Sequence, residues 1–234
     1  MIKSYLRIWV CLTPLFLLST AIHAAPKVEV YKPVAALYET RTIQLAHRPQ
    51  ANNQRWHLWR TASKIETQSA DGSSGEVWLR DSNDNISMRR LFHKEKRIIE
   101  FTSGDLRTLS RYPEWTDRAE LIEFGLLSRL KLTGTVMVLG HKAQRYQGQI
   151  NGVDLEILWL AEYRLPALVR RVFAGREVSM HLLELHPLES SPWKQKDVSD
   201  YQAMDYADMG DNESDPFISS LSHKDTRQHE THVH

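Results

Sequence analysis

Residues 143–160 read AQRYQGQINGVDLEILWL, and this stretch predicts two neighbouring β-strands joined by a tight turn. Asn151 and Gly152 tolerate the positive φ values that a two-residue type I′ hairpin requires. Ala143–Ile150 and Val153–Leu160 are therefore expected to pair as adjacent antiparallel strands.

Short apolar or alternating runs, separated by turn residues, extend in both directions from this hairpin. They predict further strands at Arg55–Arg60, Gly75–Arg80, Ile86–His93, Arg97–Thr102, Thr135–Leu139, Ala167–Phe173 and Val178–His186. The spacing fits an antiparallel meander. The expected fold class is mainly β (α+β), a strongly curved antiparallel sheet, or half-barrel, with a few short covering helices.

Helical spacing of apolar residues interrupts the meander between Pro113 and Leu132. Gly125 is expected to divide this segment into two short helices. Another helix is predicted at Pro33–Leu45. The turn-forming residues 103–105 are interpreted as a connection between strands.

The first 24 residues read as an export signal. Lys3 and Arg7 precede a mostly apolar run over residues 8–22, and cleavage is expected near Ala24/Ala25. The only cysteine, Cys11, would leave with the signal, so no disulfide or cysteine metal ligand is expected. An exported domain of this length without thiols predicts a location in the periplasm of a Gram-negative bacterium.

Three segments are expected along the chain. They are a signal peptide (1–24), a curved β-sheet domain (25–190) and an acidic, His-containing, largely disordered tail (191–234), with one docking element around Tyr201–Met209. Residues 25–199 carry 26 Lys/Arg and 21 Asp/Glu, whereas residues 200–234 carry two and eight. This balance of basic and acidic residues argues against nucleic-acid binding. No second long apolar run exists, so no transmembrane span is expected after signal cleavage.

Motifs of common enzyme classes are missing from the sequence, and the chain is predicted not to be an enzyme. It contains no Gly-x-Ser-x-Gly elbow, no His-Glu-x-x-His helix and no phosphate-binding glycine loop. Two carboxylate pairs, Glu120 with Glu123 and Asp154 with Glu156, are interpreted as surface acids.

The histidines suggest one speculative metal site. His181 and His186 are five residues apart on the last predicted strand, so they are expected on opposite faces and are poor co-ligands. The tail carries His223, His229, His232 and His234, whose imidazoles suit a divalent metal. The alternative is a solvated polar tail that binds metal only incidentally. No other cofactor is expected.

The predicted strands carry more large apolar side chains than one short helical segment could cover. These side chains are Trp56, Leu58, Trp78, Met88, Ile99, Phe101, Leu155, Ile157 and Trp159. Either the sheet curls around a helix and buries them, or it leaves a groove for an apolar ligand, and both can hold at once. They are the candidate ligand-binding residues of an apolar concave face.

The order of these features resembles the periplasmic lipoprotein-carrier superfamily of half-barrels, which includes LolA/LolB-like and RseB-like proteins. The likeness begins at Arg55–Arg60 ahead of a polar run. It is strongest over Ala143–Gly148, Asn151-Gly152, Val153–Leu160, Leu165–Leu168 and Val178–Leu185. It covers about residues 30–187.

The resemblance implies a curved sheet closed by short helices, with an apolar concavity that binds acyl chains or lipidated polypeptides. Residues 115–132 would then form part of a lid. Two features depart from the group: its carriers lack an acidic, His-bearing extension, and no residue here aligns with their lid-locking arginine. No individual functional residue is therefore carried over.

The leading hypothesis is a periplasmic, non-enzymatic binding or carrier protein for an acyl chain, lipid or lipidated envelope protein. One alternative is a metal-handling or assembly accessory protein that uses the tail histidines. Another is an envelope regulatory or scaffold protein that recognises a protein partner through the half-barrel edge or the tail.

Overall fold

The structure is a computed structural model that describes residues 31–44, 51–212 and 214–221. Twelve strands form a single sheet in the order β12-β6-β5-β4-β3-β2-β1-β11-β10-β9-β8-β7. The strands are β1 (Val34–Gln44), β2 (Ala51–Arg60), β3 (Lys64–Ser69), β4 (Ser74–Arg80), β5 (Ile86–Phe92), β6 (Arg97–Phe101), β7 (Lys131–Val138), β8 (His141–Ile150), β9 (Val153–Leu160), β10 (Leu165–Phe173), β11 (Arg176–Pro187) and β12 (Gln202–Asp205).

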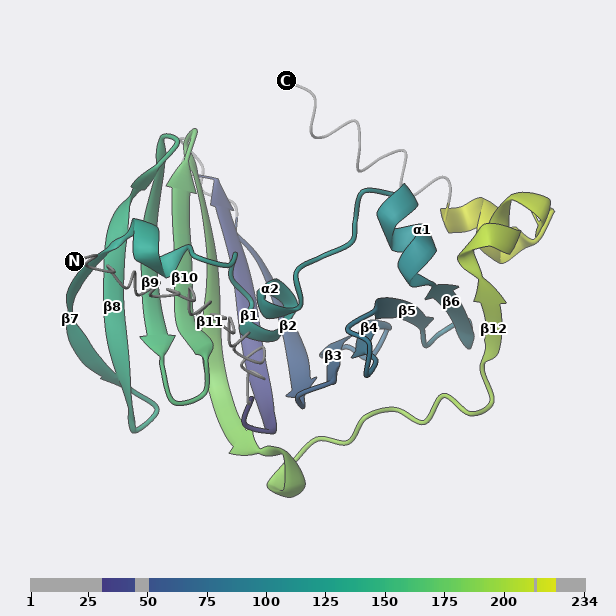
Figure 1. Cartoon of the computed structure of the whole chain (residues 1–234), viewed down its shortest axis with the longest axis horizontal. Coiled ribbons are helices and arrows are strands. Elements are labelled where there is room, and N and C mark those ends of the chain that lie inside the picture. Colours follow the sequence, from purple (N-terminus) through teal and green to yellow (C-terminus); the bar gives the residue numbers. More distant parts are fainter. Residues whose placement is uncertain (1–30, 45–50, 213, 222–234) are drawn as a thin grey trace, which may run out of the picture.

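The sheet is strongly bent and remains open, with β12 and β7 at its two edges (Figure 1). Neighbouring strands are antiparallel, except that β12 runs parallel to β6. The predicted fold class is therefore confirmed. All nine strands expected from the sequence are present, with boundaries shifted by a few residues.

The hairpin that the sequence predicted most sharply joins β8 to β9. Ile150 pairs with Val153 across the turn. Asn151 and Gly152 have φ values of 52° and 78°, the left-handed conformation that this turn requires.

The helix predicted at Pro33–Leu45 is wrong, because residues 34–44 form β1. This strand lies at the centre of the sheet, between β2 and β11. It is rich in β-branched residues near its end, Thr40, Thr42 and Ile43, which suit a strand better than a helix. Pairing of β1 with β2 on one side and β11 on the other determines its extended conformation.

Short helices cover the concave face of the sheet, which we define as the face that bears Leu58 and Trp78. They are α1 (Ser103–Thr108), α2 (Trp115–Glu120) and the 3-10 turn η1 (Leu127–Arg129). The division near Gly125 is confirmed, whereas the predicted turn at 103–105 instead starts α1. Thr102 and Asp105 form a reciprocal capping box there, which starts a helix where composition alone indicates a turn.

A β-bulge changes the expected positions of two histidines. The register of β1 against β11 shifts between Leu37 and Tyr38, because β11 carries one extra, unpaired residue opposite this step. This reverses the alternation of β11. His181 and His186 consequently both lie on the convex face, the opposite side from Leu58: His181 pairs with Glu39, and His186 contacts Trp193.

The tail is more ordered than the sequence suggests, because residues 191–201 cross the convex face before β12 joins the sheet (Figure 1). The Trp193 ring lies 4.8 Å from the His57 ring and 5.3 Å from the His186 ring. The Tyr201 hydroxyl lies 3.0 Å from Nδ1 of His93. Burial lowers the pKa of His57 and His93, which favours neutral imidazoles beneath the tail.

Gly75 on β4 allows close approach of β3. A Cβ atom there would lie 2.7 Å from the Thr67 carbonyl oxygen and 3.4 Å from Nε2 of His93. We predict that Gly75→Ala lowers the free energy of unfolding by about 1–3 kcal/mol, because the added methyl overpacks the sheet. Urea denaturation followed by circular dichroism measures this.

The matched control is Gly134→Ala on β7, where a Cβ atom meets nothing within 4 Å. Its free energy of unfolding should stay within about 0.5 kcal/mol of that of the unmodified protein, as for surface substitutions in general. Equal midpoints of urea denaturation for the two variants would contradict the close approach of β3 to Gly75.

Candidate functional site

The nine candidate side chains of the concave face divide between two apolar clusters. Trp56, Leu58, Trp78, Met88, Ile99 and Phe101 belong to the larger cluster, beneath α1 and α2. Leu155, Ile157 and Trp159 belong to a second cluster, beneath the segment that follows α2. Eight of the nine are buried, and Trp56 is half-buried. Core packing therefore occupies most of these side chains, and ligand binding by them stays a prediction.

A cavity of about 880 Å³ lies on the concave face over strands β1–β6. Its apolar walls come from strands, from the end of α1 and from the tail. They are Trp56, Phe92, Ile99, Phe101, Leu109, Tyr206, Met209 and Leu221. Three of the nine candidates, Trp56, Ile99 and Phe101, thus line this cavity. Its volume falls within the range of about 300–1,000 Å³ that is typical of small-molecule sites.

Polar and charged side chains complete the lining of the cavity. Glu76 and Arg90 face each other on neighbouring strands, with Nε and Oε1 4.0 Å apart. The guanidinium of Arg118, on α2, lies 4.2 Å from the centre of the Trp78 ring. The cavity therefore combines apolar walls with polar groups, which suits an amphipathic ligand better than a purely apolar one.

A stacked aromatic pair fixes the Trp56 ring at the cavity wall. The rings of Tyr38 and Trp56 are 4.8 Å apart with an interplanar angle of 16°. Trp56 Nε1 donates to Thr40 Oγ1 at 3.1 Å, and the Tyr38 hydroxyl donates to the Pro166 carbonyl oxygen at 3.0 Å. Burial raises the pKa of Tyr38, so its hydroxyl stays a donor.

Arg60 joins the lid, here defined as residues 115–130, to the centre of the sheet. Its side chain is fully buried at the end of β2. Nη1 donates to the carbonyl oxygens of Ala119 at 2.6 Å and Arg164 at 3.1 Å. Nη2 donates to those of Tyr163 at 2.5 Å and Lys32 at 3.4 Å. One guanidinium thus connects α2, the β9–β10 turn and the chain before β1.

An ion pair reinforces the same junction. Arg164 pairs with Glu120 at the end of α2, and both guanidinium groups lie over the Tyr31 ring. Burial lowers the pKa of Arg60 to about 10, which still leaves it charged at neutral pH.

Arg60 is not among the residues expected at the site, although the sequence carries one signal for it. Trp56, Leu58 and Arg60 alternate along β2 and therefore share the apolar face. A charged residue at such a position calls for buried hydrogen-bond acceptors. Only the fold shows that these acceptors are backbone carbonyls, which have no sequence signature.

The two carboxylate pairs do not form acid–base sites, but their interpretation as surface acids is wrong for Glu120, which is buried. Glu120 pairs with Arg164, and Glu123 lies 3.2 Å from Arg129. On β9, Glu156 lies 3.2 Å from Arg145, and Asp154 accepts from Gln149. Each carboxylate thus has a partner of its own.

The predicted metal site lies outside the described residues, because His223, His229, His232 and His234 are beyond residue 221. Within residues 31–44, 51–212 and 214–221, no group of three or more potential ligands could hold a metal. No helix in this part of the chain is long and apolar enough to cross a membrane.

Neither a family model nor a curated protein matches the sequence. Solved structures do match. MucB is 12% identical over 73% of this chain and 59% of its own, with a TM-score of 0.43. A LolA superfamily protein from Nitrosomonas europaea is 8% identical over 70% of this chain and 91% of its own, with a TM-score of 0.33. PNGF-II is 12% identical over 75% of this chain, with a TM-score of 0.39.

The chain spans only 32% of PNGF-II and 59% of MucB. At these identities the likeness concerns the fold alone. The bent, open sheet with short covering helices is itself the architecture that the sequence predicted.

Arg60 generates a prediction about stability. Arg60→Met is expected to lower the free energy of unfolding by about 3 kcal/mol, since each buried carbonyl left without a donor costs about 1–3 kcal/mol. Arg60→Lys should recover part of this loss, because an ammonium retains the charge but cannot reach all the acceptors. Urea denaturation measures both variants.

Arg171→Met on β10 is the matched control, because the Arg171 side chain is exposed. Its effect should remain within about 0.5 kcal/mol. If Arg60→Met and Arg171→Met unfold at the same urea concentration, Arg60 does not hold the lid.

Proposed function

We propose that the protein is a non-enzymatic periplasmic binding protein that holds an acyl chain, a lipid or a lipidated envelope protein on its concave face. The cavity over strands β1–β6 is the observation that carries this proposal. Its volume is about 880 Å³, and strands, a helix and the tail all supply apolar walls.

Burial of apolar ligand surface drives binding in this proposal. It contributes about 25 cal/mol for each Å² removed from water. Ordering of the ligand and loss of its translational freedom offset part of this gain. Charged groups such as Arg90 and Arg118 then orient a polar headgroup at the cavity, while the chain lies against Trp56 and Phe101.

The lid gives this binding protein a means of controlling exchange. The segment is short, and Arg60 and Arg164 connect it to the sheet through a few polar contacts. Breaking these contacts separates α2 from the β9–β10 turn without unpairing any strand. Such an element can shift between closed and open populations when a ligand favours one of them.

A fluorescent fatty acid tests the proposal directly. The intact protein should bind dansyl-labelled undecanoic acid saturably, with increased emission in the apolar cavity. Leu109→Glu places a charge in the cavity wall and should weaken binding at least about tenfold, which corresponds to about 1.4 kcal/mol. Fluorescence titration measures both affinities, and circular dichroism checks that the variant is folded.

The control is Leu132→Glu on β7, which is 53% exposed and lies outside the cavity. Its affinity should match that of the unmodified protein. Absence of saturable binding, or equal binding by both variants, would refute the cavity as the ligand site.

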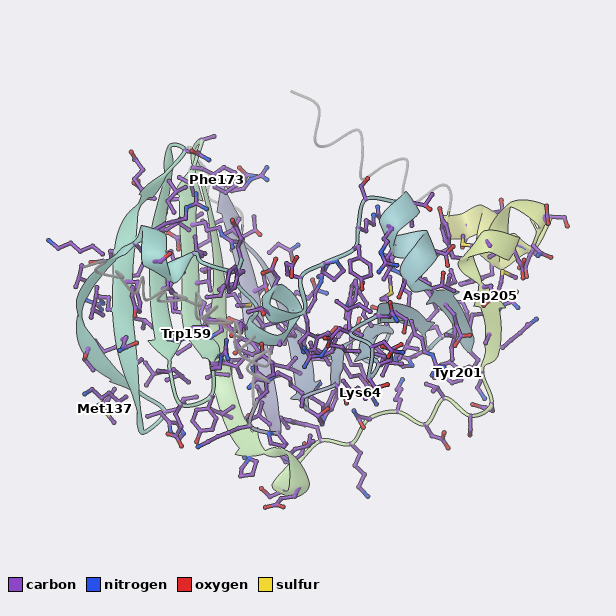
Figure 2. The ribbon with its side chains drawn as sticks, in the orientation of Figure 1. Lys64, Met137, Trp159, Phe173, Tyr201 and Asp205 are labelled. Carbon is purple, nitrogen blue, oxygen red and sulfur yellow. The ribbon has the colours of Figure 1, made fainter. Side chains whose placement is uncertain are left out.

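A protein-recognition role is the second candidate, and the β7 edge favours it. Met137, at the opposite end of the molecule from Asp205 of β12, is 68% exposed (Figure 2). Leu132 and Leu139 are 53% and 49% exposed, and residues 132–140 include no charged side chain. An open, uncharged edge can accept an extended segment of a partner as an added strand.

Cross-linking in cells followed by mass spectrometry tests this second role. Met137→Lys should abolish adducts on residues 131–139, since edge lysines oppose strand addition. Phe124→Lys, which replaces a 70% exposed side chain outside the strands, should retain them. Adducts that persist in Met137→Lys would exclude strand addition at β7.

A further inference from the structure

After β12 the chain turns back onto the concave face. We call residues 206–212 and 214–221 the strap. The Tyr206 ring stacks on the Phe101 ring, with centroids 4.7 Å apart and an interplanar angle of 24°. The Phe217 ring meets the Phe92 ring edge-on at 5.0 Å. The tail thus runs from the convex face through the edge strand β12 to the concave face (Figures 1 and 2).

The strap covers the same apolar surface that a ligand of the cavity would cover. Phe92 and Phe101 line the cavity and are also the rings on which the strap lies. Tyr206, Met209 and Leu221 of the strap line the cavity as well. An acyl chain that spreads across the concave face must therefore meet the strap.

The strap is attached less firmly than the part of the tail before it. On the convex face, Val198 and Tyr201 pack against a buried cluster, and Gln195 donates to the buried Glu66 at 2.8 Å. In the strap, Ile218 is buried, whereas its other described side chains are half-buried or exposed. Segments with so little buried surface open at low free energy while the rest of the fold stays intact.

One polar anchor holds the strap to the sheet edge. Asp215 pairs with Arg97 of β6, and the Arg97 guanidinium lies 5.2 Å from the centre of the Phe217 ring. The Asp215 carboxylate also accepts from the backbone N–H of Phe217 at 2.8 Å. The ion pair and the ring contact thus act together at residues 215–217. Removing both weakens the attachment of residues 215–217 and so raises the fraction of open molecules, whereas Tyr206 still stacks on Phe101.

We propose that the strap is an autoinhibitory occupant of the concave face, which a ligand displaces from Phe92 and Phe101 while β12 stays paired with β6. This inference rests on the proposed function, because it concerns regulation of the same cavity. The apolar surface beneath the strap is accessible only when the strap is released, so a ligand that needs this surface has an apparent affinity reduced by the fraction of open molecules. Release of the strap therefore raises both the affinity and the rate of association.

The test uses the full chain with two substitutions in the strap, Asp215→Asn and Phe217→Ala. The probe is dansyl-labelled undecanoic acid. We expect its Kd to fall by about tenfold if the strap is open about a tenth of the time, with faster association in stopped-flow fluorescence. The matched control is Asp208→Asn with Asp211→Asn, which changes charge at exposed strap positions and should leave Kd unchanged.

Hydrogen exchange provides a second readout that separates the possible outcomes. In the unmodified protein, saturating probe should increase exchange at residues 215–221 while β12 remains protected. Equal Kd and association rates in the released variant and the unmodified protein would overturn the strap proposal alone. Weaker binding by the released variant would also overturn it, because the strap would then be a supporting wall. If neither protein binds the probe, the proposed function itself fails.

Discussion

The buried guanidinium of Arg60 joins parts of the molecule that have few other connections. It donates to carbonyl oxygens on α2, on the β9–β10 turn and on the residue before Pro33. The α2 helix has only six residues, far fewer than a helix needs to persist in water. It covers the sheet because Arg60 holds its end and because Trp115 and Ala119 pack into the apolar core. Without that contact, the apolar concave face would lose part of its cover.

The sequence predicts the sheet well because most of its strands are specified locally. Asn151-Gly152 defines one hairpin, and apolar alternation marks the strands on both sides of it. The central strand β1 was missed because its conformation depends on β2 and β11, which are distant in sequence. β3 was missed because it is polar: Glu66 is buried against Gln195 of the tail, so a charged side chain occupies an interior position.

The candidate site is predicted only in part, for a related reason. Trp56, Ile99 and Phe101 lie on strands whose alternation identifies their face. Tyr206, Met209 and Leu221 come from a segment whose composition indicates disorder. Their positions depend on a few aromatic contacts, such as Tyr206 on Phe101, rather than on any periodic pattern. The sequence signal for these positions is a few aromatic residues in a polar tail. Such isolated residues form no periodic pattern from which a position can be predicted.

The pairing of β1 with β11 determines when the protein can fold. Val34 pairs with Pro187, so the first and penultimate strands of the sheet meet at its centre. Contacts between such distant residues slow folding, since a long loop must close before they form. A growing chain consequently cannot complete the centre of its sheet until residue 187 has emerged. Until then, apolar strands that lack their partners are prone to aggregation.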